Sequence, residues 1–238
     1  MTEKLLDNIN YNYHLIEERI AEAAAKVGKS REDITFLAAT KTVDAEVINY
    51  AISLGLRYIG ENKVQELLSK YDDYNLQNTS LQFIGHLQSN KVRQIVGKVD
   101  LIQSVDSVKL AKEISKQSAK NNICTDVLVE VNIGMEESKS GVLPENLHEL
   151  LDEIKDFDNI SVKGLMTIPP ICDSKQKISN FFAKMNNIFI DISSKNIDNI
   201  SMDILSMGMS ADYYEAILSG ANMVRIGSSL FGARNYNK

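Results

Sequence analysis

Cysteine, histidine and proline are scarce in this sequence, and their scarcity argues against several kinds of site. Among 238 residues there are two cysteines, three histidines and three prolines. Cys124 and Cys172 lie far apart and lack the paired spacing of a zinc site or a redox motif, so we expect free, buried thiols. His14, His86 and His148 stand apart from any local cysteine or carboxylate pattern. The sequence therefore gives little support to a metal site.

An excess of basic residues and long apolar runs are also absent. The 26 lysine and arginine residues are outnumbered by 32 aspartate and glutamate residues, which gives a net charge of -6. A protein that binds a phosphate backbone needs a basic surface, so nucleic acid is not an expected partner. Residues 1–14 lack the apolar stretch of a secretion signal, and no later run approaches the roughly 18 apolar residues of a membrane span. We expect a cytoplasmic protein without a membrane partner.

The pattern of apolar residues predicts one helix followed by alternating strands and helices. Apolar side chains recur at three- and four-residue steps from Leu6 to Ile20, as in an amphipathic helix that ends near Gly28. After it, short apolar runs alternate with helical patterns, and no linker rich in proline, glycine or serine divides the chain. The runs are 34–41, 57–62, 81–87, 101–105, 126–133, 162–168, 203–210 and 223–232.

These runs predict a parallel sheet. Most of them are too continuously apolar for a half-exposed antiparallel strand, and helices separate them, as in sheets that are covered on both faces. Eight units favour an α/β fold, a (β/α)8 TIM-like barrel with an additional N-terminal helix, and we expect residues 1–238 to form a single domain. With 44% hydrophobic residues the chain can bury a sizeable core. The alternative is an open doubly wound sheet, although no GxGxxG follows the first run.

Lys41 ends the first apolar run, at the place where barrels carry functional groups. A lysine there cannot easily extend away from the barrel mouth. Burial disfavours the charged ammonium, which would make the amine available for attack on a carbonyl carbon. The structural alternative is a lysine whose stem lies along the rim and whose ammonium stays in solvent. Lys41 is therefore the candidate for a Schiff base.

Two turns near the end of the sequence predict an anion site. Segments 206–217 and 224–229 each combine glycine and serine at the end of a strand. The loops after the seventh and eighth strands are the usual phosphate site of such barrels, because backbone N–H groups are exposed there. Ser206, Gly227 and Ser228 are the phosphate candidates, and the alternative is that they serve only as turn and cap residues.

Arg225 and Asn62 complete the predicted site. Arg225 precedes Gly227 by two positions and lies deeper in the barrel, where it would face a ligand ring or pair with a carboxylate such as Glu130. Asn62 ends its run, where its side chain would hydrogen-bond a phenolic oxygen or cap a helix. The neighbouring Glu61 is expected to be only a structural partner.

His86 and Lys139 also lie in segments that follow strands. His86 is a conceivable acid/base group, but a histidine that is hydrogen-bonded for structural reasons is the preferred interpretation. Lys139 stands between two serines, where it would bind an anion or remain solvated. We place neither residue in the main predicted site.

Distinctive motifs recur along nearly the whole chain. They are FLAATK (36–41), IGENKVQE (59–66), FIGHLQSNK (83–91), NIGMEESKSG (132–141), GLMTIP (164–169), LSMGMSADYYEAI (205–217) and VRIGSSLFGARNY (224–236). Their order and spacing resemble those of the pyridoxal phosphate homeostasis protein family, the single-domain barrel relatives of the amino-terminal domain of alanine racemase. Met207 and Tyr214 depart from the residues that are frequent in these relatives.

The resemblance implies that the cofactor is pyridoxal 5'-phosphate. It implies that Lys41 forms the Schiff base and that Arg225 approaches the pyridine nitrogen. Ser206, Gly227 and Ser228 would hold the phosphate. An arginine at the pyridine nitrogen, in place of a carboxylate, disfavours protonation of that nitrogen and weakens the ring as an electron sink.

We therefore expect a protein of intracellular pyridoxal phosphate (vitamin B6) homeostasis that buffers or delivers the cofactor without amino-acid turnover. We expect it to be a monomer, and apo-enzymes that require pyridoxal phosphate are the candidate partners. Alanine racemase takes its second acid/base group from a further domain, whereas this sequence ends six residues after Gly232. The alternatives are a pyridoxal-phosphate-dependent racemase or lyase that uses Lys41 and His86, and a Schiff-base aldolase that binds a phosphorylated sugar.

Overall fold

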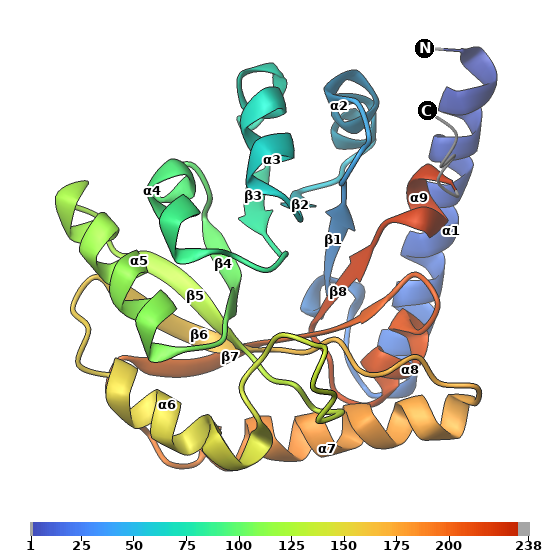
Figure 1. The fold of residues 1–238 in the computed structure, drawn as a ribbon. Helices are drawn as coiled ribbons and strands as arrows, with labels where there is room; N and C mark the ends of the chain where they lie inside the picture. Colours follow the sequence, from blue (N-terminus) through green and yellow to red (C-terminus); the bar gives the residue numbers. More distant parts are fainter. Residues whose placement is uncertain (1, 233–238) are drawn as a thin grey trace.

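Eight parallel strands close into one barrel in the computed structural model, which describes residues 2–232 (Figure 1). Each strand pairs with the next one along the chain, and the last pairs with the first. This arrangement confirms the predicted closed barrel and excludes the open doubly wound sheet. The strands are β1 (Thr35–Ala39), β2 (Tyr58–Glu61), β3 (Ser80–Phe83), β4 (Leu101–Val105), β5 (Thr125–Glu130), β6 (Ile160–Met166), β7 (Ile200–Met209) and β8 (Met223–Ile226).

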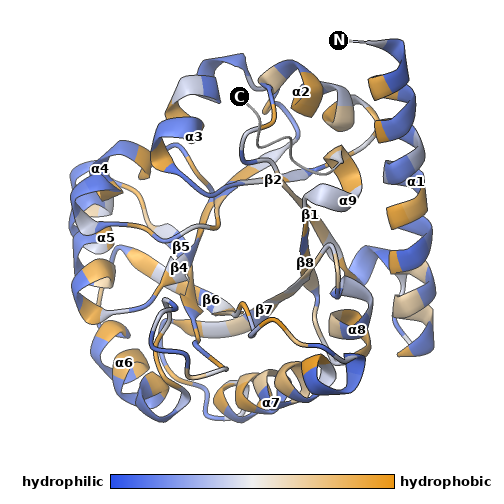
Figure 2. Cartoon of the chain, turned by 45° about the vertical axis from the view of Figure 1, so that its right-hand side comes forward, coloured by the Kyte–Doolittle hydropathy of each residue, from blue (hydrophilic) through white to orange (hydrophobic). Residues whose placement is uncertain are grey.

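Helices surround the ring of strands on its outer side (Figure 2). None of the helices within residues 2–232 is long and apolar enough to cross a membrane. The α-helices are α1 (Glu3–Lys26), α2 (Ala45–Ser53), α3 (Val64–Lys70), α4 (Val92–Ile95), α5 (Val108–Lys120), α6 (Leu147–Ile154), α7 (Lys175–Ser193), α8 (Tyr213–Leu218) and α9 (Ser228–Phe231). Short 3-10 helices are η1 (Arg31–Asp33), η2 (Tyr71–Asp73), η3 (Ser89–Lys91) and η4 (Pro144–Asn146).

The predicted N-terminal helix is confirmed as α1. Its buried side chains include Ile9, Tyr13, Ile16 and Ile20, which lie three or four residues apart and therefore share one face. This face packs against α8 and α9. The helix ends just before Gly28, whose φ of +72° is the left-handed conformation that often follows a helix. The apolar spacing and the glycine stop thus both act as the sequence predicts.

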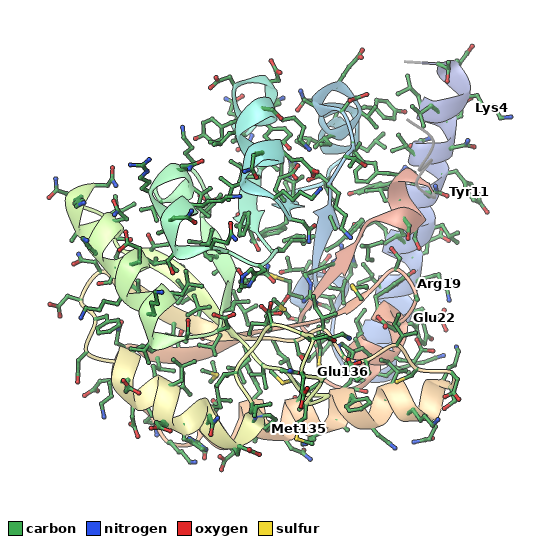
Figure 3. All side chains as sticks on the ribbon, in the orientation of Figure 1. Lys4, Tyr11, Arg19, Glu22, Met135 and Glu136 are labelled. Carbon is green, nitrogen blue, oxygen red and sulfur yellow. The ribbon has the colours of Figure 1, made fainter. Side chains whose placement is uncertain are left out.

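The opposite face of α1 is polar and turned away from the barrel. Figure 3 shows Tyr11, Arg19 and Glu22 on this outer side. The Tyr214 hydroxyl on α8 donates a hydrogen bond of 2.6 Å to Glu22 and accepts one of 2.7 Å from Lys26. Tyr214, one of the two departures from the family pattern, therefore joins α8 to α1 at the surface.

The strand side chains alternate between two apolar layers. Phe36 and Ala38 of β1 belong to the large core between the barrel and its helices. Leu37 and Ala39 point the other way, into a small core inside the barrel that also contains Met223. Both faces of a strand are thus covered, which explains why the predicted runs are apolar without interruption.

The two cysteines are free, but the prediction that they are buried was wrong. Cys124 is exposed and Cys172 is partly exposed. Cys124 lies between α5 and β5, and Cys172 lies in the loop from β6 to α7. Neither position belongs to a strand or helix with a buried face, so the apolar character of the thiol does not place it in the core.

Candidate functional site

A cavity of 320 Å³ lies at the carboxyl ends of β1, β2, β7 and β8. Ile84, Ile168, Met209 and Phe231 contribute apolar walls. The cavity also brings together five of the six residues that the sequence analysis assigned to the site, although they come from opposite ends of the chain. These are Lys41, Asn62, Arg225, Gly227 and Ser228.

Lys41 follows β1 and is held in an unusual backbone conformation. Its φ is 44°, in the left-handed region. For a residue other than glycine this conformation costs roughly 1–2 kcal/mol. The residue lies in a turn that the Val43 N–H closes by donating to the Thr40 carbonyl at 2.9 Å. The Thr40 N–H in turn donates to the Gly60 carbonyl of β2 at 3.0 Å. The barrel thus fixes the chain immediately before Lys41.

A buried carboxylate lies beneath this turn. Glu61, at the end of β2, is fully buried, and its Oε1 accepts hydrogen bonds from Thr40 Oγ1 at 2.6 Å, Tyr74 Oη at 2.6 Å and Lys70 Nζ at 2.5 Å. Burial, and next the charge of Glu61, raise the pKa of Tyr74. The tyrosine therefore stays a hydrogen-bond donor to the carboxylate. Glu61 has the structural role that the sequence suggested.

Lys70 was not identified from the sequence. Its Nζ also donates to the backbone carbonyls of Lys41 at 2.6 Å and of Val43 at 3.2 Å. The residue is the last of α3, and its partners precede it by 9 to 29 residues. No local pattern in the sequence could have connected these positions.

Arg225 lies in the middle of a buried polar chain inside the barrel. Its Nη1 donates to Ser206 Oγ at 2.6 Å and its Nη2 donates to the Thr167 carbonyl at 2.8 Å. Ser206 Oγ donates onward to Gln103 Oε1 at 2.7 Å. Burial lowers the pKa of Arg225 to about 10, and the carboxylates of Glu130 and Asp212 oppose this shift.

Glu130 influences Arg225 through its charge, whereas Ser206 and Thr167 make the hydrogen bonds. Glu130 ends β5 and is buried. Burial, and next the charge of Asp106, raise its pKa to about 7, while Arg225 lowers it. The sequence left open whether Arg225 pairs with Glu130. In the structure the two side chains interact through their charges.

The structure puts Ser206 below the cavity and not among its lining residues. Ser206 is fully buried and lies level with Met223, whereas Met209 lies level with Arg225. Ser206 is thus deeper in the barrel than Arg225, and its hydroxyl contacts the guanidinium. The assignment of Ser206 to the phosphate group does not fit this position.

Ser210, which the sequence analysis missed, lies at the cavity instead. Its Oγ accepts hydrogen bonds from the N–H groups of Gly227 at 3.1 Å and Ser229 at 3.2 Å. At Gly227 an added Cβ would lie 2.9 Å from the Ala39 carbonyl oxygen, so glycine permits the close approach of the two chain segments. The sequence did contain a signal for Ser210, because it is the last residue of the predicted run 203–210 and directly follows β7, which ends at Met209.

Asn62 presents an unsatisfied polar atom. Its Oδ1 is buried and has no hydrogen-bond partner among residues 2–232. Asn62 does not cap α3, because that helix begins at Val64 and Lys63 occupies the cap position. A buried amide oxygen without a partner is costly, so a ligand group or water in the cavity is the natural partner.

His86 and Lys139 do not line the cavity. His86 Nδ1 lies 3.1 Å from Ser140 Oγ, and its side chain is 57% exposed. Lys139 Nζ lies 2.7 Å from Glu136, a residue labelled in Figure 3, and 3.1 Å from the Pro169 carbonyl. Within the described part of the chain no group of three or more histidine, cysteine or acidic side chains could bind a metal ion.

The sequence matches the family described as "Alanine racemase, N-terminal domain" over residues 6–235. It is 45% identical over 219 residues to a protein of Aquifex aeolicus named pyridoxal phosphate homeostasis protein, covering 92% of this chain and 95% of the relative. It is 37% identical to a protein of the same name from Haemophilus influenzae, covering 97% of this chain and 98% of the relative. The chain belongs to the pyridoxal phosphate homeostasis protein family.

Solved structures extend the comparison. The crystal structure of a protein from Bifidobacterium adolescentis, described only as unknown, is 33% identical and superposes with a TM-score of 0.91, and the match covers 97% of each chain. PipY of Synechococcus elongatus PCC7942, solved with pyridoxal phosphate bound, is 28% identical with a TM-score of 0.78. The match covers 90% of this chain and 100% of PipY. The pyridoxal phosphate homeostasis relatives are named for a homeostasis role and not for a reaction. Of the segments that carry the resemblance to this family, residues 233–236 lie outside the described residues.

Proposed function

We propose that this chain binds pyridoxal 5'-phosphate covalently at Lys41 and takes part in its homeostasis without turning over an amino acid. The observation that carries the proposal is a cavity whose lining includes Lys41, the serines and glycine of the two late turns, and the buried Arg225. PipY, which was solved with pyridoxal phosphate bound, supports the same ligand.

The residues present fit the cofactor. Pyridoxal phosphate supplies an aldehyde that condenses with an amine, with loss of one water molecule, and a phosphate that needs hydrogen-bond donors. Lys41 supplies the amine. The unsatisfied Asn62 amide oxygen indicates that a polar group is missing from its surroundings. The Ser210 hydroxyl, which accepts from the Gly227 and Ser229 N–H groups, lies at the cavity, so its own O–H can donate to an anion there.

We assign each part of the site to one part of the ligand. Ser210, Gly227 and Ser228 hold the phosphate, and Asn62 lies beside the phenolic oxygen. Arg225 faces the pyridine nitrogen. Ser206 has no contact with the ligand in this assignment. Its hydroxyl accepts a hydrogen bond from the Arg225 guanidinium and so positions Arg225.

The charges in the cavity argue for storage of the cofactor and against turnover. Among the described residues that line it, Lys41 and Arg225 are the only ionisable side chains. Racemisation needs a second acid/base group opposite the lysine, and the lining residues offer none within 2–232. A positive guanidinium at the ring nitrogen also opposes its protonation, which weakens stabilisation of a carbanion.

The wider role follows from this site. We infer that residues 1–238 form a single cytoplasmic domain that acts as a monomer and releases the cofactor to apo-enzymes that require it. The continuous circle of strand pairing supports one domain. An acceptor enzyme is chemically reasonable because a Schiff base exchanges with another amine without oxidation or reduction.

The test is an absorbance spectrum of the purified protein with pyridoxal phosphate, before and after borohydride reduction, followed by peptide mapping. A band that disappears on reduction, with the adduct on Lys41, is expected. Lys139→Ala is the matched control, because Lys139 lies outside the cavity. No band, or an adduct only on other lysines, would refute the site. Turnover of an amino acid that Lys41→Ala abolishes would establish the racemase or lyase alternative, and trapping of a sugar phosphate would establish the aldolase.

A further inference from the structure

The Lys70 ammonium joins α3 to the turn that carries Lys41. It lies within 2.5 Å of Glu61 Oε1 and within 2.6 Å of the Lys41 carbonyl oxygen, and it also reaches the Val43 carbonyl at 3.2 Å. The Lys70 side chain is 13% exposed and that of Glu61 is fully buried. Three oxygen acceptors around one ammonium satisfy its three donors.

The same carboxylate also reaches the residue before Lys41. Thr40 Oγ1 donates to Glu61 Oε1 at 2.6 Å, and it also lies 3.0 Å from the Gly60 carbonyl. The chain is therefore held on both sides of Lys41, through the Thr40 side chain on one side and through the Lys41 and Val43 carbonyls on the other. Glu61 and Lys70 together form this clamp.

A clamp of this kind has a purpose at Lys41 because its backbone is strained. A residue other than glycine adopts a positive φ only when surrounding contacts hold it there. The backbone conformation sets the direction of the Cα–Cβ bond, and four further rotatable bonds separate Cβ from the amine. A rotation of the turn would therefore change the point from which the side chain extends and lower the fraction of its conformers in which the amine reaches a ligand in the cavity.

We propose that Lys70, charge-paired with Glu61, is a positioning residue that holds the Lys41 backbone so that its amine points into the cavity. The inference rests on the proposed function, because it assigns Lys70 a role only if Lys41 is the attachment site. Lys70 is absent from the lining of the cavity and touches the lysine through its backbone carbonyl. It therefore affects how fast and where the adduct forms, and has no contact with the ligand.

Tyr74 provides a matched control. Its hydroxyl donates to the same Glu61 oxygen at 2.6 Å and is hydrogen-bonded to the Thr40 side chain, whereas the Lys41 and Val43 carbonyls are held by Lys70. Tyr74→Phe removes these buried hydrogen bonds of the hydroxyl from the network and leaves the ammonium on the Lys41 carbonyl. A general loss of stability around Glu61 would thus appear in both Tyr74→Phe and Lys70→Met.

The experiment compares wild type, Lys70→Met, the double variant Glu61→Gln with Lys70→Met, and Tyr74→Phe. The rate of Schiff-base formation is followed by absorbance at a fixed concentration of pyridoxal phosphate, the adduct is mapped after borohydride reduction, and urea unfolding reports stability. The double variant leaves no unpaired buried charge, so it keeps the test decisive if Lys70→Met alone fails to fold.

We expect Lys70→Met and the double variant to form the Lys41 adduct about tenfold more slowly, the factor that loss of one charge-assisted hydrogen bond represents. Tyr74→Phe should stay within about twofold of wild type. Equal rates in all variants, or slowing in proportion to lost stability in Tyr74→Phe as well, would overturn the inference. Failure of wild type itself to form the Lys41 adduct would instead refute the proposed function, so the two failures are distinguishable.

Discussion

The Arg225 guanidinium donates a 2.6 Å hydrogen bond to the Ser206 hydroxyl, which lies deeper in the barrel than Arg225 itself. The Ser206 hydroxyl in turn donates a hydrogen bond to Gln103 Oε1. Arg225 is therefore held by side chains in the barrel interior. Ser206, first considered for a ligand phosphate, thus supports the residue that we propose to face the ligand ring.

Ser206→Ala should destabilise the fold and weaken cofactor binding together. The change leaves the buried Arg225 and Gln103 each without one partner, at a cost of about 1–3 kcal/mol. Urea unfolding and titration with pyridoxal phosphate measure the two effects. Ser201→Ala, on the same strand but partly exposed, is the control and should change neither by much. Unchanged stability in Ser206→Ala would show that the interior chain does not hold Arg225.

Ser210→Ala should act on the phosphate end of the site alone. Its hydroxyl accepts from the Gly227 and Ser229 N–H groups at the proposed phosphate site. We expect affinity for pyridoxal phosphate to fall by about tenfold, as for loss of one hydrogen bond to a charged group. Affinity for pyridoxal, which lacks the phosphate, should stay near that of wild type. Equal losses for both ligands would contradict the assignment of Ser210.

Gly227→Ala should disturb the junction of β8 with β1. The new Cβ would lie 2.9 Å from the Ala39 carbonyl oxygen, which is backbone and cannot move aside cheaply. We expect a loss of about 1–3 kcal/mol in unfolding free energy, as in other overpacked sites, and a loss of adduct formation at Lys41. Thermal unfolding and the absorbance band test this, and Ser228→Ala, which adds no atoms, is the comparison for unfolding only, because Ser228 belongs to the proposed phosphate site.

Glu130→Gln should change how stability depends on pH. The carboxyl has an ordinary pKa of 4.5 and a folded pKa of about 7, raised first by burial and then by Asp106. Between these values the folded state holds the proton more tightly than the unfolded state, so stability falls as pH rises from 4.5 to 7. The difference corresponds to at most about 3 kcal/mol. Urea unfolding at pH 5 and pH 8 should show a smaller difference in Glu130→Gln than in wild type, and an unchanged difference would exclude Glu130 as the cause.

The barrel could be predicted from the sequence because most strands are buried on both faces. Phe36 and Ala38 pack outward while Leu37 and Ala39 pack inward, and the apolar run that results is visible without any structure. The position of Lys41 at the end of that run followed directly. Free cysteines were predicted correctly, but their exposure was not, because burial of Cys124 and Cys172 depends on loops and not on a periodic pattern.

The choice between Ser206 and Ser210 required the structure. The pairing of β7 with β8 shifts its register between Ser206 and Met209, so the end of the strand depends on its neighbour. Lys70 was missed for a similar reason, since its contacts join α3 to a turn 29 residues earlier. Contacts that depend on tertiary packing do not produce a regular spacing of residues in the sequence, so they cannot be predicted from it.

The pairing of β8 with β1 has a consequence for the synthesis of the protein. The proposed attachment residue, Lys41, follows the first strand, and the proposed phosphate residues Gly227 and Ser228 follow the last, so they meet only where the barrel closes. A nascent chain whose β8 is still in the ribosome has Lys41 but lacks the proposed phosphate residues Gly227 and Ser228. Because the cofactor would then bind only the closed ring, its supply would favour completion of folding by mass action. Binding of pyridoxal phosphate would thus depend on β8 having joined the barrel.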